Sequence, residues 1–211
     1  MGTPPEPRRG TEEPLRSSRR IRPHDRRLPR RAAAGRRSFA STLAALDELA
    51  ESGAKVAVRV TDLDRGDAVL SGDDFITLPI GGLGVVPLLV EVAAAFDDGR
   101  LDPAEVVDRT STDGVSVAGL WHHLAAQTFS LGDLAVLAAS AGDALAANVL
   151  LERVGLEAVR NRLGQLGMPR SALLDGFRDS RGPDDAPHVT LGTAAEMSEL
   201  FSALVNSSAV N

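Results

Sequence analysis

The sequence has no cysteine, which excludes disulfide bonds, thiol nucleophiles and thiolate metal sites. Lysine is almost as scarce, since Lys55 stands alone beside 22 arginines. A desolvated lysine can lose its proton and act as a base, whereas an arginine stays protonated in proteins. Any chemistry that needs an amine base is therefore restricted to the position of Lys55.

Long apolar runs are missing as well. No stretch approaches the ~18 apolar residues of a membrane-spanning helix. The pair Arg36-Arg37 precedes a moderately apolar stretch, as in an export signal, but that stretch contains Asp47 and Glu48. Its apolar residues have the spacing of a surface helix rather than of a signal core. We therefore expect a cytoplasmic protein that makes no membrane contact.

Charge is divided unevenly along the chain. Residues 1–37 contain 12 arginines and four acids, a net charge of +8, whereas residues 38–211 contain 11 basic and 25 acidic residues, a net charge of −14. The first segment is rich in Arg and Pro and lacks apolar periodicity, which predicts a disordered tail over residues 1–37 and one folded domain over residues 38–211. Three interpretations of the tail stay open: an arm for nucleic acid or anionic lipid, a solvated extension, or a GC-rich gene read from an incorrect start or frame. Because the acidic domain repels phosphate, direct nucleic-acid binding is the least favoured.

Apolar periodicity divides the domain into helices around one hairpin. The hairpin strands are predicted over residues 56–61 and 68–71, with a turn at residues 64–66. Helices are predicted over residues 38–51, 85–96, 130–141, 143–154, 156–166 and 193–205. The helix over residues 85–96 should bury Leu89, Val92 and Phe96. Residues 168–189 read as a long irregular loop that carries four acids, Asp175, Asp179, Asp184 and Asp185.

Three of these helices follow a side chain that can cap an N-terminus. Ser130 and Thr193 each stand three residues before an acid, the spacing of a capping box. Asp143 directly precedes the helix over residues 143–154. We expect each of the three side chains to accept a hydrogen bond from a backbone N–H in the first turn.

Several segments, in order, resemble the class A β-lactamases and the wider family of penicillin-recognising serine hydrolases. Residues 78–89 (LPIGGLGVVPLL), with DGRLD at 98–102, are similar to the family's nucleophile helix and its exit. Residues 146–151 (AANVLL) are similar to the helix after its second motif, and residues 182–200 to the end of its omega-shaped loop and the next helix. The resemblance covers about residues 39–205. It implies an α+β fold, layered α/β/α, with a helical lobe.

At the positions that correspond to the family's functional motifs, this sequence has other residue types. The Ser-x-x-Lys motif, in which the lysine helps to deprotonate the serine, corresponds to Gly82-Leu-Gly-Val85. The Ser-Asp-Asn motif corresponds to Gly142, Asp143 and Ala144, so that the aspartate alone is retained. The sequence reaches Asn211 without a Lys-Thr-Gly motif. We therefore expect a domain that is incomplete at its C-terminus, without about three strands of the family's sheet, and a hairpin edge open to another chain.

The loop over residues 168–189 also lacks the glutamate that activates water in the class A enzymes. Asp175 and Asp179 are carboxylates in the right loop, but an aspartate is one methylene shorter and is a poor replacement. Ser140 lies near the degenerate second motif, and His122-His123 lie in the region that faces the family's cleft, yet no spacing brings them together. Adjacent histidines point apart, so no metal site is expected, and no cofactor is implied.

The resemblance implies a catalytically inactive β-lactamase-like protein. Such relatives can be encoded near β-lactamase genes and act in the induction of the enzyme, so a regulator or sensor is the leading hypothesis. Its cleft would hold a β-lactam or a cell-wall fragment against Asp143, Asn148, Trp121 and Ser140. A regulatory protein, or a second copy at the open sheet edge, would be its partner. Two alternatives remain: a serine β-lactamase whose sequence is truncated or altered, and a nucleic-acid-binding protein that uses the Arg-rich tail.

Overall fold

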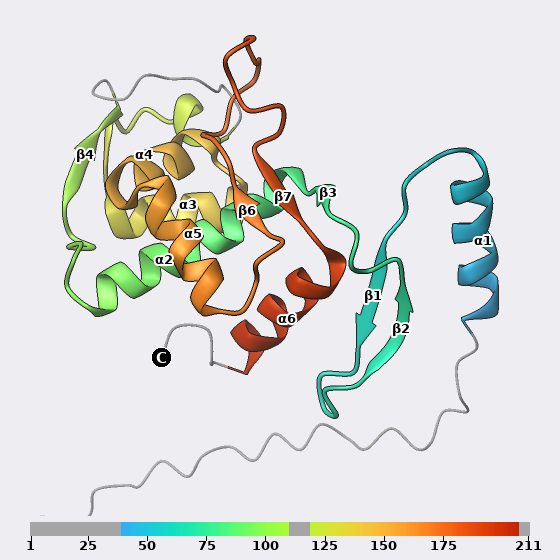
Figure 1. Cartoon of the computed structure of the whole chain (residues 1–211). Coiled ribbons are helices and arrows are strands. Elements are labelled where there is room, and N and C mark those ends of the chain that lie inside the picture. The colour runs from blue at the N-terminus through green and yellow to red at the C-terminus, as the bar shows by residue number, and fades with distance from the viewer. Residues whose placement is uncertain (1–38, 110–118, 207–211) are drawn as a thin grey trace, which may run out of the picture. The chain divides into compact units, whose positions relative to one another are not determined.

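The computed structural model of the chain describes residues 39–109 and 119–206. The chain divides into two units at Ser38/Phe39, and every described residue belongs to the second unit. The predicted tail over residues 1–37 lies outside the described residues. Figure 1 shows the described helices and strands in chain order.

The first described elements are one helix and one hairpin. Helix α1 (Ala40–Glu51) confirms the first predicted helix, and none of its side chains is buried. Strands β1 (Val58–Thr61) and β2 (Ala68–Gly72) form the predicted antiparallel hairpin. Gly66 has a φ of +73° in the turn between them, which a residue with a side chain rarely adopts.

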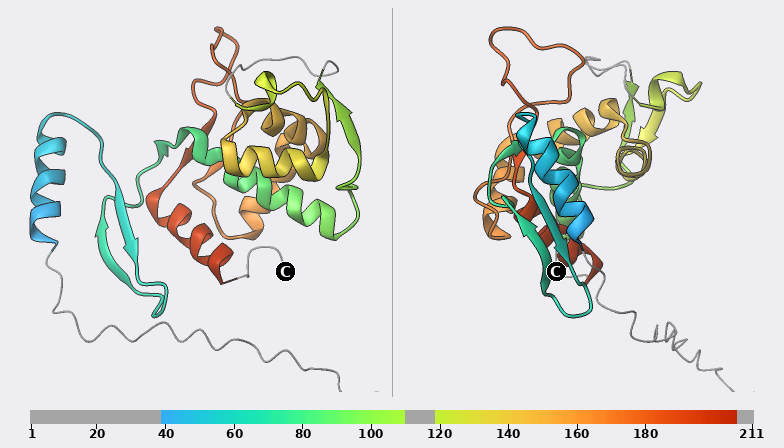
Figure 2. Two further views of the ribbon diagram at one scale, coloured as in Figure 1. Left: turned by 180° about the vertical axis from the view of Figure 1, so that it is seen from behind. Right: turned by 90° about the vertical axis from the view of Figure 1, so that its right-hand side faces the viewer.

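Helix α2 (Val85–Asp97) lies among three further helices: α3 (Leu131–Ala141), α4 (Ala144–Val154) and α5 (Leu156–Gln165) (Figures 1 and 2). It begins after η1 (Gly81–Gly84), a single turn of 3₁₀ helix that the sequence did not predict. Val92 is buried as expected, but Leu89 and Phe96 are only half-buried. The prediction holds in part for these two, because they pack against the core but also line an open apolar groove between α2 and α3. Burial extends to Leu88 and Ala95 on other faces of α2.

The three predicted caps are confirmed. Ser130 Oγ accepts a hydrogen bond from the backbone N–H of Asp133 at 3.1 Å, and Asp143 Oδ1 accepts one from Ala146 at 2.8 Å. Thr193 Oγ1 accepts one from Glu196 at 3.1 Å. Each bond satisfies an N–H that the helix itself cannot pair, so short-range sequence patterns are sufficient to position the helix starts.

Two further small sheets tie distant segments together. Strands β4 (Val106–Asp108) and β5 (Thr128–Ser130) pair antiparallel, and η3 (Trp121–His123) lies between them in sequence. Strand β7 (Thr190–Gly192) pairs with both β3 (Leu78–Pro79) and β6 (Ala172–Leu173). The predicted irregular loop therefore contains a strand. Strands of two or three residues carry too little periodicity to be predicted before their partners are known.

Helix α6 (Ala194–Val205) packs against β1. The largest group of buried side chains is contributed mainly by α2, α3 and α4, with Trp121, Leu131 and Leu150 among its fully buried members. This mixture of helices with small sheets is the α+β class predicted from the sequence. No helix in the described part of the chain is long and apolar enough to cross a bilayer.

Candidate functional site

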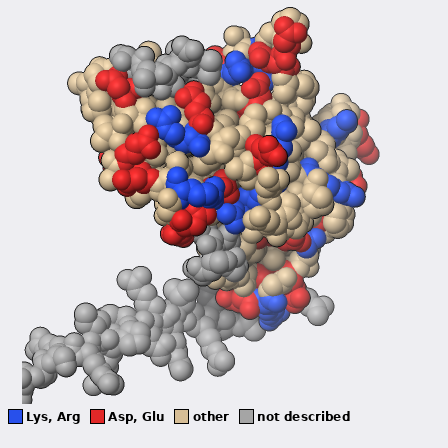
Figure 3. Space-filling view, turned by 60° about the vertical axis from the view of Figure 1, so that its left-hand side comes forward, with Lys and Arg blue, Asp and Glu red and all other residues tan. Residues whose placement is uncertain are grey.

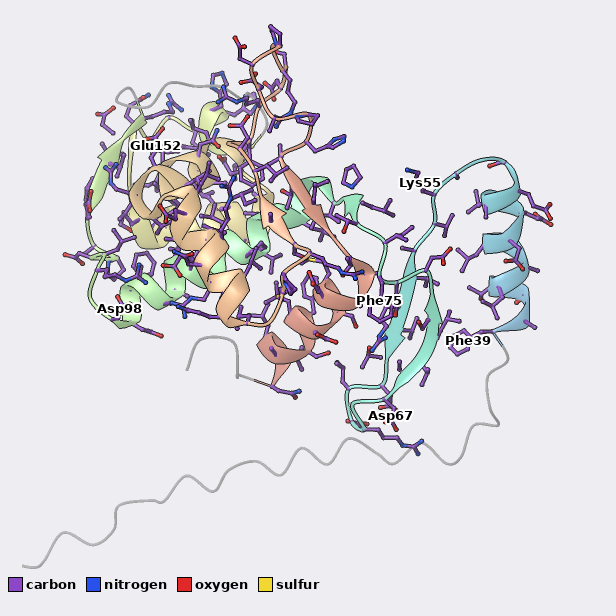
Figure 4. All side chains as sticks on the ribbon, viewed as in Figure 1. Phe39, Lys55, Asp67, Phe75, Asp98 and Glu152 are labelled. Atoms are coloured by element: carbon purple, nitrogen blue, oxygen red, sulfur yellow. The ribbon has the colours of Figure 1, made fainter. Side chains whose placement is uncertain are left out.

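The turn η1 and the first residue of α2 carry the two positions where a nucleophile and an amine base were sought. Gly82 is exposed in η1, and a Cβ added there would meet no atom within 4 Å. Val85, one helical turn later, is half-buried. Lys55 lies in the segment that joins α1 to β1 (Figure 4). The site thus has open space at Gly82 beside an apolar side chain, without a hydroxyl or an amine on either position.

The position in this segment that requires a glycine is Gly84 and not Gly82. A Cβ on Gly84 would collide with the side chain of Thr190 on β7. Gly84 and Thr190 are both buried, so neither can move aside into solvent. The close approach of η1 to β7 therefore depends on Gly84, whereas Gly82 has room for a side chain.

Asp143 and Trp121 are brought together, but through the backbone. Asp143 is almost fully buried, and its Oδ2 accepts a hydrogen bond from the backbone N–H of Trp121 at 2.6 Å. Its other oxygen caps α4. Gly119 packs so tightly on this carboxylate that a Cβ would lie 2.5 Å from Asp143 Cγ. Both carboxylate oxygens of Asp143 thus accept hydrogen bonds from backbone N–H groups of the protein itself.

The other members of the second motif offer no polar side chain. Gly142 is exposed and ends α3 with a φ of +62°, and Ala144 is the half-buried first residue of α4. Trp121 has no exposed surface, and its ring lies edge-on to Phe129 with centroids 5.7 Å apart. Its indole N–H has no acceptor among the described residues.

Asn148 fastens the loop over residues 168–189, called the acidic loop from here on, to α4. Its Nδ2 donates to the carbonyl oxygen of Phe177 at 2.8 Å, and its Oδ1 accepts from the N–H of the same residue at 2.8 Å. The side chain is 6% exposed. Its two polar groups are therefore engaged in positioning the loop, and ligand binding by Asn148 stays a prediction.

The acidic loop is held by its own arginines. Burial alone would raise the pKa of Asp175, but hydrogen bonds from Arg178, the Gly176 N–H and Arg181 lower it below its ordinary value. Arg181 also donates to the Ala186 carbonyl oxygen at 2.6 Å. A carboxylate with a lowered pKa accepts a proton poorly near neutral pH, which disfavours Asp175 as a general base.

Ser140 and the histidines do not form a catalytic pair in the described structure. The Ser140 hydroxyl donates to the Val136 carbonyl oxygen one turn earlier in α3, at 2.6 Å. His122 and His123 are exposed, and their rings contact each other with centroids 5.6 Å apart, so the expectation that they point apart was wrong. Across residues 39–109 and 119–206, no group of three or more metal-ligating side chains could hold a metal ion.

Two hollows beside α6 bring together residues that the sequence analysis did not connect with one another. One, of about 370 Å³, lies between β1 and α6 and is lined by Arg59, Thr61, Leu63, Ala194, Ser198, Phe201, Ser202 and Val205. The other, of about 270 Å³, is an apolar groove of α2, α3 and α6 that includes Val85, Leu89, Phe201 and Leu204. Only tertiary packing brings these residues together, so no local sequence pattern could have indicated them.

Comparison with known proteins identifies the fold. The structure matches a β-lactamase from Sphaerobacter thermophilus with a TM-score of 0.72 at 22% identity, covering 82% of this chain and 65% of that one. The chromosome-encoded β-lactamase of Vibrio parahaemolyticus gives a TM-score of 0.68 at 17% identity, with the same coverage. Penicillin-binding protein D2 of Listeria monocytogenes gives 0.55 at 23%, covering 72% and 61%. At these identities the matches show the fold alone.

The chain spans about 65% of the length of the β-lactamases that it matches. Comparison with curated proteins gave no match. The sequence model of the β-lactamase enzyme family matches residues 38–211, which is most of the chain. The protein therefore belongs to the β-lactamase enzyme family.

Proposed function

We propose that this member of the β-lactamase family does not hydrolyse β-lactams and acts in the cytoplasm as a regulator or sensor in the induction of β-lactamase production. The observation that carries the proposal is the open position at Gly82, which is exposed, has no atom within 4 Å of an added Cβ, and has no side chain that attacks a carbonyl. Val85, one turn on, cannot accept a proton.

A site without a nucleophile suits a reversible signal. An acylating enzyme forms a covalent bond with its ligand, whereas a sensor shifts between states according to differences in noncovalent affinity. Two separate contacts support the proposal because they fix the backbone on either side of α4: Asp143 holds the N–H of Trp121, and Asn148 holds Phe177. The ligand would be a β-lactam or a cell-wall fragment, read out through a regulatory protein partner.

Ligand-induced stabilisation tests the proposal. We expect benzylpenicillin or a muropeptide to raise the melting temperature of the full chain in a concentration-dependent way. Gly82→Phe should abolish the shift because it fills the open position. Gly164→Phe on α5 is the matched control, since Gly164 is likewise exposed with no atom within 4 Å of a Cβ. No shift with either ligand, or an equal loss in both variants, would contradict binding at Gly82.

A second candidate is a serine hydrolase that acts on β-lactams, which membership of the β-lactamase enzyme family favours. The double variant Gly82→Ser, Val85→Lys separates the two. We expect no useful turnover of a chromogenic cephalosporin by this variant, because Asp175 is held by arginines and the second motif retains only the capping Asp143. Appreciable turnover would support the hydrolase.

A further inference from the structure

A third hollow, of about 320 Å³, lies between α4, the start of α5 and the acidic loop. It is formed within one stretch of chain, by Asn148, Leu151, Glu152, Gly155, Leu156, Gly176 and Arg178. Its two glycines leave space: among the described residues, a Cβ on Gly155 would meet no atom within 4 Å, and one on Gly176 would meet only Asn148. This volume, called the Gly176 hollow from here on, is at the small end of the range for small-molecule sites, about 300–1,000 Å³.

Part of the wall of the Gly176 hollow is apolar. Leu151 is 7% exposed and Leu156 is half-buried, and both pack in the largest group of buried side chains. The amide of Asn148 is already bonded to Phe177 through both its oxygen and its nitrogen. An apolar group of a ligand would therefore displace water from the two leucines, which is favourable.

One carboxylate at the hollow has no partner in the described part of the chain. Glu152 on α4 is exposed (Figure 4), and no described residue forms a hydrogen bond or an ion pair with its carboxylate. Arg178, in contrast, donates to both oxygens of Asp175, each at 3.2 Å, and lies 3.7 Å from Asp185. The charge at the hollow that is left without a counter-charge is therefore negative.

The neighbouring helix terminus does not reverse this sign. The N-terminus of α5 carries a partial positive charge, but Glu157 in the first turn of the helix offsets it. Charged side chains of both signs are mixed over the face seen in Figure 3, and salt screens exposed charges beyond about 10 Å. The nearest full charge, that of Glu152, therefore determines that a cationic ligand is favoured over an anionic one.

We propose that the Gly176 hollow binds a small primary amine that carries an apolar group. The ammonium group pairs with Glu152, and the apolar group packs against Leu151 and Leu156. An apolar wall with one charged group that fixes orientation is the usual composition of a small-molecule site.

Such a ligand contacts α4 and the acidic loop at the same time. It lies beside Gly176, next to the hydrogen bonds between Asn148 and Phe177, and so adds a second connection between the helix and the loop. The proposal goes beyond the sensor function and does not depend on β-lactam binding, because neither Gly82 nor Asp143 lines the hollow.

Three compounds of similar shape and different charge test the proposal: 2-phenylethylamine, the neutral 2-phenylethanol and the anion hydrocinnamate. Their binding to the full, nitrogen-15-labelled chain is followed by NMR titration of the backbone amides at neutral pH. We expect the amine to shift the amides of Gly155 and Gly176 with a Kd of about 1 mM or below, and the other two to bind at least about fivefold more weakly. Equal binding of the three compounds, shifts centred elsewhere in the chain, or no saturable shift at about 10 mM amine would overturn the proposal.

Two protein variants locate the charge contact. Glu152→Gln removes the carboxylate charge and keeps the size of the side chain. Glu199→Gln on α6 is the matched control, because Glu199 is also exposed on a helix, has no side-chain partner among the described residues and does not line the hollow. We expect Glu152→Gln to weaken binding of the amine at least about fivefold and to leave the alcohol unchanged, whereas Glu199→Gln should change neither by more than about twofold. Equal effects of the two variants on the amine would overturn the proposal, and so would an equal loss of amine and alcohol in Glu152→Gln, since a charge contact acts on the amine alone.

Discussion

Asn148 binds both backbone polar groups of Phe177, although the two residues are 29 positions apart. The amide accepts one hydrogen bond and donates the other, each at 2.8 Å, and so connects α4 to the acidic loop. Gly176 lies directly against this amide, since its Cβ would be 3.3 Å from Asn148 Oδ1. Asn148 is therefore the side chain by which α4 fixes residues 176–177 of the loop.

Replacing Asn148 should free the loop. Asn148→Ala leaves a part-buried N–H and a carbonyl group of Phe177 without partners, so we expect a loss of about 2–4 kcal/mol in the free energy of unfolding. Urea unfolding measures this loss, and faster trypsin cleavage at Arg178 or Arg181 would report the loop itself. Asn161→Ala on the exposed face of α5 is the control and should change stability by less than about 0.5 kcal/mol. Unchanged cleavage in Asn148→Ala would contradict the role of this contact.

Glu91 is a buried carboxylate shared by two arginines. It accepts from Arg100 Nη1 at 2.7 Å and from Arg162 Nε at 2.8 Å, and its side chain is 4% exposed. We expect Glu91→Gln to destabilise the protein by about 3 kcal/mol, because two guanidinium groups lose their shared charge partner. Glu152→Gln on α4 is an exposed control that should be nearly neutral. Chemical denaturation of both variants makes the comparison, and equal midpoints would contradict the prediction.

Stability should fall in acid. Hydrogen bonds from Arg59 and then from Ser71 lower the pKa of Asp74, and a hydrogen bond from Arg100 lowers the pKa of Asp98. A lowered folded-state pKa adds stability that is fully present above the unfolded value of about 3.9 and is lost as pH falls through the folded value. We expect a constant melting temperature from about pH 7 to 5 and a decline below about pH 4. Asp74→Asn should make that decline shallower, whereas an unchanged slope would exclude Asp74 as a contributor.

Two glycines of the same segment should differ in how much stability an alanine costs. Gly84→Ala places a methyl group against Thr190, and we expect a loss of about 1–3 kcal/mol from overpacking. Gly82→Ala adds a methyl group in open space and should change stability by less than about 0.5 kcal/mol. Thermal unfolding of the two variants is sufficient to compare them. Equal losses would show that the space at Gly82 is not free.

Local features of the fold could be predicted from the sequence. Each of three helix caps contacts a backbone N–H three residues further along the chain: Ser130, Asp143 and Thr193. The alternating sequence of β1 and the turn glycine Gly66 likewise depend on neighbouring residues only. The predicted capping box at Thr193 is only half present, however. Glu196 bonds instead to Ser171 and to the Arg170 N–H, which lie on a segment that packs beside it.

The candidate site was harder to predict because its contacts are distant in sequence. Asn148 and Trp121 were singled out as ligand residues, and only the folded chain shows that Asn148 holds Phe177 and that the Trp121 ring is enclosed. Arg59 and Phe201, which line one hollow from β1 and α6, lie 142 positions apart by number and share no motif. Hydrophobic periodicity predicts elements, but the surfaces between elements depend on packing.

The central claim, that this chain does not form an acyl-enzyme, is tested most directly by intact-protein mass spectrometry after incubation with a reactive penicillin. A class A β-lactamase that can be acylated serves as the positive control for the adduct. We predict that the mass of this chain stays that of the unmodified protein. A stoichiometric mass increase equal to the penicillin would contradict the claim, and peptide mapping would then identify the nucleophile, beginning with Ser140.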